Sequence, residues 1–318
     1  MATEQTATTT VGAVTARRRR STQAQADARL GFALVAPAVI TIILVAFYPL
    51  ARSIWDSMHT ISLRFENRPR PFIGLRNYAD VLKDTRWHNA LWVTLRVVVV
   101  SVGVELTLGM VIALLLNRAF KGRGVVRASV LVPWALTTVV SAKMWSWIYD
   151  ARYGVFNDIL MKLHIIDKPI IWLSRPDLTI WAMIGAEIWK TTPFMALLLL
   201  AGLQLIPADL YEAAAIDGTN AWQNFWKITL PLVKPSILVA LLFRTIDAMR
   251  IFDLPKVLTN GGPGQSTESL VLYAYNSLFT SLNFGYGSAL AVSVFLIVLL
   301  CSFLFIKVLG TPTQGGRS

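Results

Sequence analysis

Residues 287–308 read GSALAVSVFLIVLLCSFLFIKV, and Lys307 is the only charged side chain in this run. A helix needs about 20 mostly apolar residues to cross the hydrocarbon core of a bilayer, and this run is long enough to do so. The sequence therefore predicts a membrane-spanning helix close to the carboxyl end.

The composition of the whole chain is that of a membrane protein. Of its 318 residues, 55% are hydrophobic and 15% are charged, and the mean hydropathy is +0.55. A typical soluble domain has about 25% charged residues. The composition excludes an intrinsically disordered chain, and the single cysteine, Cys301, excludes a scaffold of disulfides within the chain.

Five further runs lead to an all-α, polytopic prediction. The six predicted spans cover about residues 30–54, 91–116, 128–149, 178–203, 236–254 and 287–308. The fifth contains Arg244, Asp247 and Arg250. Each such charge costs about 2.5–3.5 kcal/mol at the centre of an inserted helix, so these side chains must face the bundle interior or a wet cavity.

Basic residues set the predicted orientation. Arg17 to Arg20 and Arg29 precede the first span, and four more basic residues lie within residues 117–127. This density predicts that both termini are cytoplasmic, with residues 1–29 as a disordered basic tail and 311–318 as a second tail. The charge of +12 lies mostly between apolar runs, so no nucleic-acid partner is predicted. None of the three histidines lies in a long apolar run, so no metal site is predicted.

Residues 206–235 form a polar segment between the fourth and fifth spans, and we predict two short helices there. Pro207 suits a first helical turn, and Gly218 is placed to end that helix in the left-handed conformation. Asn220 and Gln223 resemble a capping box for the second helix, which Leu230-Pro231 is expected to close.

The second of these helices has an apolar, aromatic face formed by Trp222, Phe225 and Trp226. Such a face can lie in the lipid interface or against a partner protein. An interfacial helix is usually rich in Lys and Arg, yet residues 207–230 contain one basic residue, Lys227, and three acidic ones. This composition favours a protein partner.

The run EAAAIDG at residues 212–218, followed by Phe225, Ile228, Leu230, Pro231 and Pro235, resembles the EAA signature of permease subunits in binding-protein-dependent ABC importers. Further segments resemble the sugar-importing branch: Pro133-Trp134, residues 145–149, Gly154, Asn157, residues 252–253 and residues 258–263. The likeness covers nearly the whole chain from Leu30. The sequence as a whole also resembles permeases of actinobacterial trehalose importers, although no single motif carries this resemblance.

This resemblance implies a type I importer permease with six spans, whose loop docks on a cytoplasmic ATPase. Glu212 would form an ion pair with the ATPase, and Gly218 would make the tight turn between the two helices. The aromatic face would be the surface that docks on the ATPase. The implied coupling residues are Glu212, Ala213, Ala214, Asp217, Gly218, Trp222, Phe225, Leu230 and Pro231. The implied cargo is a sugar, either a disaccharide such as trehalose or an oligosaccharide.

The resemblance also implies the partners. These are a second homologous permease, two cytoplasmic ABC ATPase subunits, and an extracellular or lipid-anchored solute-binding protein, assembled in a bacterial cytoplasmic membrane. The sequence has no Walker A motif, so ATP and Mg²⁺ are expected on the ATPase, with no cofactor and no catalysis on this chain.

Polar residues within the spans are candidates for a substrate pathway. Glu187, Thr191 and Phe194 fall on one face of the fourth span, and Arg244 and Asp247 lie at similar depth on the fifth. They could contact the sugar.

The other interpretation is that these charges only neutralise one another. Glu187 would then pair with Lys190, and Arg244 and Arg250 would pair with Asp247. Glu105 is expected to pair with Arg96 and to be structural.

Two other functions remain open. An ion-gradient-driven secondary transporter would also use intramembrane charges, but it has no need of the two-helix loop. A membrane-embedded transferase would need clustered carboxylates. Glu212 and Asp217 are five residues apart, about 140° around a helix, and no metal-binding motif accompanies them.

Overall fold

The computed structural model describes residues 27–64 and 69–309, and these are almost entirely helical. Within these residues there is no extended strand, only isolated bridges that join His59 to Phe72 and Ser62 to Asn283. The chain divides into two compact units, Met1–Trp55 and Asp56–Ser318. Most of the two predicted tails lies outside the described residues.

The first unit is dominated by one continuous helical segment, Asp27–Ser57, which starts slightly before the predicted residue 30. It contains a π-helical turn, η1 (Ile43–Phe47), and ends in α2 (Tyr48–Ser57). Its apolar side chains are exposed around the whole helix. Such a surface suits a helix immersed in lipid.

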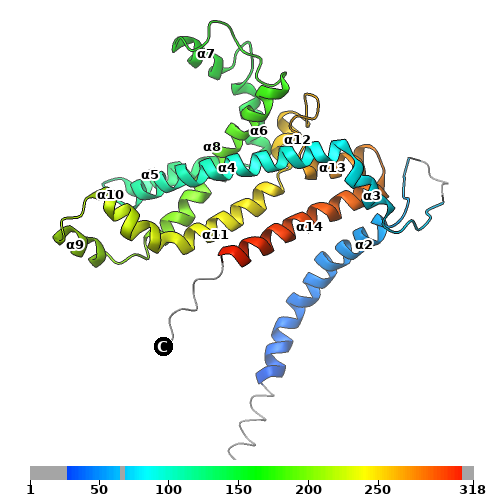
Figure 1. Cartoon of the computed structure of the whole chain (residues 1–318), viewed down its shortest axis with the longest axis horizontal. Helices are drawn as coiled ribbons and strands as arrows, with labels where there is room; N and C mark the ends of the chain where they lie inside the picture. Colours follow the sequence, from blue (N-terminus) through cyan, green and yellow to red (C-terminus); the bar gives the residue numbers. More distant parts are fainter. Residues whose placement is uncertain (1–26, 65–68, 310–318) are drawn as a thin grey trace, which may run out of the picture. The chain divides into compact units, whose positions relative to one another are not determined.

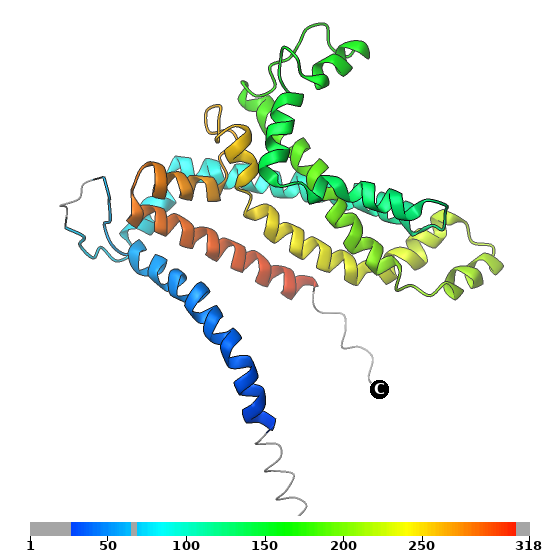
Figure 2. The ribbon, with the colours of Figure 1, turned by 180° about the vertical axis from the view of Figure 1, so that it is seen from behind.

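The second unit contains the remaining helices, which Figures 1 and 2 show from opposite sides. In chain order they are α3 (Arg76–Lys83), α4 (Thr85–Asn117), α5 (Arg123–Ala135), α6 (Thr138–Ile148), α7 (Val155–Lys162), α8 (Pro176–Leu203), α9 (Asp209–Ile216), α10 (Ala221–Asn224), η2 (Phe225–Thr229), α11 (Leu230–Met249), α12 (Asp253–Leu258), α13 (Leu270–Tyr275), η3 (Asn276–Thr280) and α14 (Phe284–Leu309).

Within the described residues, five segments are long and apolar enough to cross a membrane. They are Asp27–Ser57, Thr85–Asn117, Pro176–Leu203, Ala221–Leu258 and Phe284–Lys307. The predicted span at 128–149 differs in shape, because α5 and α6 meet at a bend of 90° and make a sixth span only if they are taken together. The helix breaks at Leu136, which is extended, shortly after Pro133. A proline cannot donate the helical hydrogen bond and bends the helix around it.

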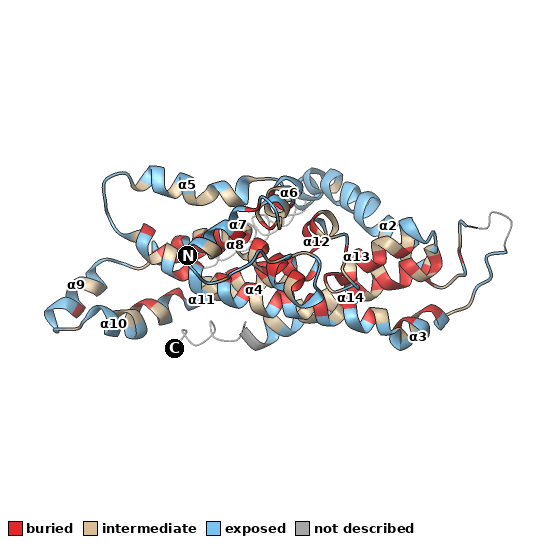
Figure 3. Ribbon diagram, turned by 90° about the horizontal axis from the view of Figure 1, so that it is seen from above, coloured by how far each residue is buried: buried red, intermediate tan, exposed pale blue. Residues whose placement is uncertain are grey.

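The core is built on the close packing of α4, α8 and α11. Met110, Met195, Leu199 and Val233 are buried together there. Gly202 brings α8 against α11, because a Cβ built at this position would lie 2.2 Å from Ser236 Oγ. Small residues allow helix backbones to approach closely inside membranes. Figure 3 shows the buried residues gathered along α4, α8 and α13, and the exposed surfaces of α9 and α10.

The second unit has two distinct ends. Leu116, Leu203 and Val233 pack in one cluster, so the chain after α4 and the chain after α8 emerge at the same end, which also holds α9 and α10. At the opposite end, Trp87 near the start of α4 packs with Tyr273 of α13. We call these the coupling end and the outer end.

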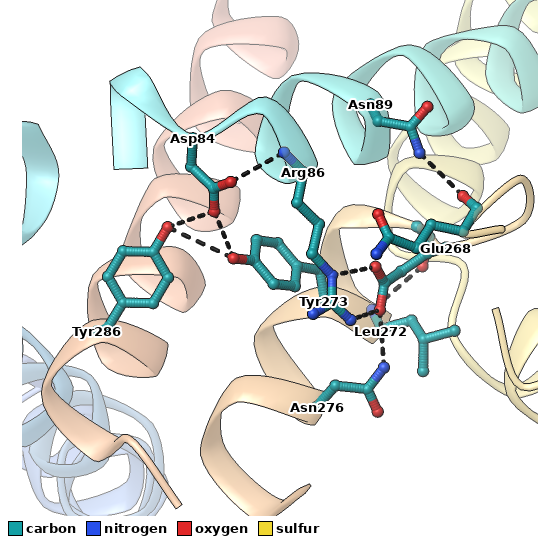
Figure 4. A network of polar contacts seen from close by, with 10 residues as sticks. Asp84, Arg86, Asn89, Glu268, Leu272, Tyr273, Asn276 and Tyr286 are labelled. Carbon is teal, nitrogen blue, oxygen red and sulfur yellow. Dashed lines mark hydrogen bonds and ion pairs between the residues drawn. The ribbon is translucent and has the colours of Figure 1, made fainter. Parts of the chain in front are cut away.

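A polar network at the outer end joins α4, α13 and α14 (Figure 4). Arg86 donates two hydrogen bonds to the buried Glu268, at 2.7 and 2.8 Å, and its guanidinium lies 4.6 Å from the centre of the Tyr273 ring. Asn276 donates a further hydrogen bond to Glu268 at 2.8 Å. The phenols of Tyr273 and Tyr286 both donate to Asp84.

These contacts change the ionisation of the groups outside the spans. Burial raises the pKa of Asp84, but the hydrogen bonds from Tyr273 and Tyr286 and from the backbone N–H of Arg86 lower it by more, so this pKa lies below its ordinary value. Burial and the hydrogen bond to Asp84 raise the pKa of Tyr273 to about 12. The network therefore holds a carboxylate and a neutral phenol at neutral pH.

We predict that Arg86→Met lowers the stability of the chain, because it leaves the carboxylate of Glu268, 3% exposed, without its cation. Arg86 itself is 38% exposed, so the expected cost is about 1–3 kcal/mol. Thermal unfolding of the purified chain in detergent micelles measures this loss. The double variant Arg86→Met/Glu268→Gln should recover part of this stability. A loss of stability in the double variant equal to the sum of the losses in the two single variants would contradict the pairing.

Candidate functional site

The loop at the coupling end folds as a compact helical hairpin. Its first helix is α9, and Gly218 follows with φ +76°, the left-handed conformation predicted for it. The predicted capping box is confirmed. Asn220 Oδ1 accepts from the backbone N–H of Gln223 at 2.9 Å, and Gln223 Oε1 accepts from the N–H of Asn220 at 3.0 Å.

Side-chain hydrogen bonds hold the two arms of the hairpin together. Tyr211 on the first arm lies 3.0 Å from Thr229 on the second, between their hydroxyl oxygens. The hydroxyl of Thr219 lies 2.7 Å from the carbonyl of Ala214, and Ala214 is buried between the arms. The loop is therefore a preformed element that needs little ordering before it binds a partner.

Two large aromatic side chains project from this hairpin. Trp222 is 70% exposed and Trp226 is 50% exposed, with their rings 5.6 Å apart. We call this pair the aromatic ridge. Phe225 lies on the same face, as predicted, with its ring centroid 6.4 Å from that of Trp222 and 5.4 Å from that of Trp226. Unlike them it is half-buried, and it packs against the core of α4, α8 and α11.

The other predicted loop residues divide by exposure. Glu212, Ala213, Asp217, Gly218 and Pro231 are exposed, and Leu230 is half-buried. Glu212 lies in the first turn of α9, and no ion pair holds it among the residues that the structure describes. An exposed carboxylate on the same hairpin as an aromatic ridge is suited to contact a basic surface on another protein.

The prediction that Leu230-Pro231 closes the second helix was wrong. The chain passes from α10 through η2 directly into α11, where the proline lies in the first turn. A proline is tolerated at the start of a helix, and the wider π turn before it redirects the hydrogen bonds, with the N–H of Leu230 donating to Phe225. The hairpin is thus continuous with a membrane span.

A buried charge cluster lies deep among α4, α8 and α11. Arg244 Nε donates to Glu105 Oε2 at 2.6 Å, Nη2 to Glu187 Oε1 at 2.6 Å, and Nη1 to Asp247 Oδ2 at 2.9 Å. The exposed fractions of these side chains are 1% for Arg244, 0% for Glu105, 7% for Glu187 and 73% for Asp247. Asp247 is thus the member of the cluster whose carboxylate remains mostly exposed in the single chain.

Thr191 also belongs to this cluster. Its hydroxyl lies 2.7 Å from Glu105 Oε1 and 2.7 Å from the carbonyl of Glu187. Phe194, predicted with it, stacks instead on Trp134 of α5, with ring centroids 5.8 Å apart. The structure therefore brings together four of the five predicted pathway residues, whereas Phe194, also on α8, packs against α5.

Glu105 was expected to be structural, but its place in the cluster around Arg244 was not predicted. Its expected pairing with Arg96 was wrong, because Arg244 takes both of its carboxylate oxygens. Arg96 is nine residues earlier, about half a turn around the helix, and faces outward while Glu105 is buried. Of the other expected pairs, Arg244 with Asp247 is present, and Glu187 has Arg244 as its ion-pair partner.

The cluster has the chemistry of a helix clamp. One guanidinium meets three carboxylates from three helices, so each helix loses a charge partner if any of them moves. Within the described part of the chain, no group of three or more His, Cys, Asp or Glu residues is arranged to hold a metal ion.

Comparison with known proteins assigns the hairpin and its spans to a family. Residues 105–310 match the model of the family described as binding-protein-dependent transport system inner membrane component. The chain belongs to this family. The permease is therefore an integral membrane transport component and not a catalytic subunit.

Similar proteins cover nearly all of the permease. It is 44% identical over 282 residues to the trehalose/maltose transport system permease protein MalF of Thermococcus litoralis, which covers 89% of this chain and 94% of that protein. It is 42% identical over 298 residues to the trehalose transport system permease protein SugA of Mycobacterium tuberculosis, covering 94% of each.

A solved structure shows the same fold. A bacterial ABC transporter involved in the import of the acidic polysaccharide alginate has a chain that superimposes with a TM-score of 0.78 at 22% identity, over 93% of the permease and 100% of that chain. This match confirms the predicted fold class, an all-helical polytopic ABC importer permease.

We predict that Arg244→Met destabilises the permease strongly, by about 3–5 kcal/mol, because it leaves buried carboxylates without their cation. Glu187→Gln should cost less, since an amide oxygen can still accept from the guanidinium. Melting temperatures of the purified permease in detergent would rank the two variants. Arg250→Gln, at an exposed position directly after the end of α11, is the control. Equal losses for Arg244→Met and Arg250→Gln would contradict the role of the cluster.

Proposed function

We propose that the permease is the transmembrane subunit of an ATP-driven importer whose cargo is a sugar, either a disaccharide such as trehalose or an oligosaccharide. The observation that carries this proposal is the preformed hairpin of α9 and α10, which presents Glu212 and the aromatic ridge at one end of the spans. A subunit that only conducted solute would have no need of such a docking element.

The names of the relatives support a sugar as the cargo. The trehalose/maltose and trehalose permeases are 44% and 42% identical to the chain, over about nine-tenths of their length. A sulfoquinovosyl glycerol permease of Agrobacterium fabrum is 40% identical, and an sn-glycerol-3-phosphate permease of the same organism is 31% identical. Among these four relatives, the two permeases named for the disaccharides trehalose and maltose have the highest sequence identity to this chain.

The hairpin docks in a groove of a cytoplasmic ATPase. Glu212 pairs there with a basic side chain, and Trp222 and Trp226 fill the groove with Ala213 and Asp217 at its rim. Gly218 allows the turn between the arms. Phe225, packed against the core, and Leu230 and Pro231, at the start of α11, connect the docked element to the spans.

The complete importer contains a second permease of similar fold, two ATPase subunits and an extracellular or lipid-anchored solute-binding protein. ATP and Mg²⁺ bind on the ATPase subunits. The coupling end faces the cytoplasm of the bacterial cell, together with both termini, because the basic residues of 117–127 emerge at that end.

The charge cluster contributes one group to the sugar pathway. Asp247 is 73% exposed at a depth where lipid does not tolerate a charge, so a water-filled path along α11 would be needed to solvate its carboxylate. Its free oxygen can accept hydrogen bonds from sugar hydroxyls. Arg244, Glu187 and Thr191 act behind it and hold it in place, and Phe194 with Trp134 offers a stacked aromatic surface.

We predict that Glu212→Ala abolishes most ATP-driven uptake in proteoliposomes that contain the complete importer. Truncating one partner of a desolvated charge pair at an interface costs about 2–5 kcal/mol, so uptake should fall by about tenfold or more. Asp209→Ala removes another acidic side chain from the first turn of α9 and is the matched control.

Unchanged uptake in Glu212→Ala would remove the coupling role. Uptake driven by an ion gradient, without the ATPase subunits, would instead support a secondary transporter.

A second prediction concerns Asp247. Asp247→Asn should raise the KM for sugar uptake by about tenfold, because a hydrogen bond to a charged group contributes about 1.5–3 kcal/mol. Basal ATP hydrolysis should stay the same. Asp253→Asn, which neutralises an exposed carboxylate on α12, serves as the comparison. If both variants have the wild-type KM, Asp247 does not contact the sugar.

A further inference from the structure

The turn between α4 and α5 concentrates positive charge at the coupling end. Arg118, Lys121 and Arg123 lie within six residues, and we call them the basic turn. The sequence contains no Asp or Glu between Glu105 and Asp150, so neighbours along the chain cannot neutralise them. No ion pair in the described part of the chain involves any of the three.

The backbone keeps these three cations close together. The N–H of Arg118 donates to the carbonyl of Leu115, and Gly122, with φ +84°, lets the chain reverse so that Arg123 N–H reaches the carbonyl of Phe120 at 3.4 Å. A fourth cation, Arg127, points back and donates to the carbonyl of Leu116 at 3.1 Å. Arg127 thus caps α4, whereas the side chains of the basic turn have no hydrogen-bond acceptor among residues 27–64 and 69–309.

Exposed apolar side chains surround the basic turn. Phe120 is 43% exposed and Val125, in the first turn of α5, is 72% exposed. Cations next to exposed apolar groups, at the ends of two apolar helices, lie where the hydrocarbon of a membrane meets water. A contact with a soluble partner would not require this apolar flank.

We propose that the basic turn binds the phosphate headgroup of an anionic phospholipid, whose acyl chains lie along Phe120 and Val125. Three unpaired cations attract a negatively charged headgroup in preference to a zwitterionic one. The site differs from the hairpin and from the charge cluster, and it does not depend on the identity of the cargo. It lies at the coupling end, which also holds α9 and α10.

The test uses the full-length permease in nonionic detergent, with dioleoylphosphatidylglycerol and dioleoylphosphatidylcholine as probes. Native mass spectrometry counts the lipids retained, and thermal unfolding measures their protection. The variant Arg118→Gln/Lys121→Gln/Arg123→Gln removes the site. The control variant Lys83→Gln/Arg152→Gln/Lys168→Gln removes the same charge from exposed positions outside the basic turn.

We expect phosphatidylglycerol to bind wild type and control alike and to bind the basic-turn variant about tenfold more weakly. Lys121→Gln alone should give a partial loss, which keeps the test decisive if the triple variant does not fold. Equal retention of both lipids by wild type, equal losses in both triple variants, or the same protection by inorganic phosphate would overturn the proposal.

Discussion

The fold of the permease depends on the burial of one guanidinium. Arg244 lies in the interior of the spans, where an unpaired charge would be prohibitive, and it is satisfied only by carboxylates from α4 and α8 together with Asp247 on its own helix. The three helices must therefore meet at one depth and with one rotation. The apolar contacts around Met110, Met195 and Leu199 would tolerate small rotations, but this hydrogen-bond geometry does not.

Much of this architecture could be predicted from the sequence, because apolar length and turn chemistry are local properties. The spans at α4, α8 and α14, the left-handed Gly218 and the capping box of Asn220 all follow from residues within one or two turns of each other. The partner of Glu105 could not be found in this way. Arg244 is 139 residues later, and only the packing of α4 against α11 brings the two together.

The errors have local physical causes. The break between α5 and α6 follows Pro133, yet the sequence around it is apolar enough to suggest an unbroken span. Leu230-Pro231 suggested an end because proline usually interrupts a helix, whereas the π turn before it lets the helix continue. Phe225 lies with Trp222 and Trp226 as its spacing predicts, but its burial depends on the packed core of the spans, which the helical period of this segment does not report.

The close contact between Gly202 and Ser236 has a mechanical meaning. Because glycine has only a hydrogen atom as its side chain, the backbone of α8 at Gly202 lies directly against the side chains of Ser236 and Val233 on α11. The two helices are therefore in close packing contact at Gly202, and neither can move toward the other at this point. A larger side chain at residue 202 would force the two helices apart, so the spacing of α8 and α11 at this level is set by the absence of a side chain.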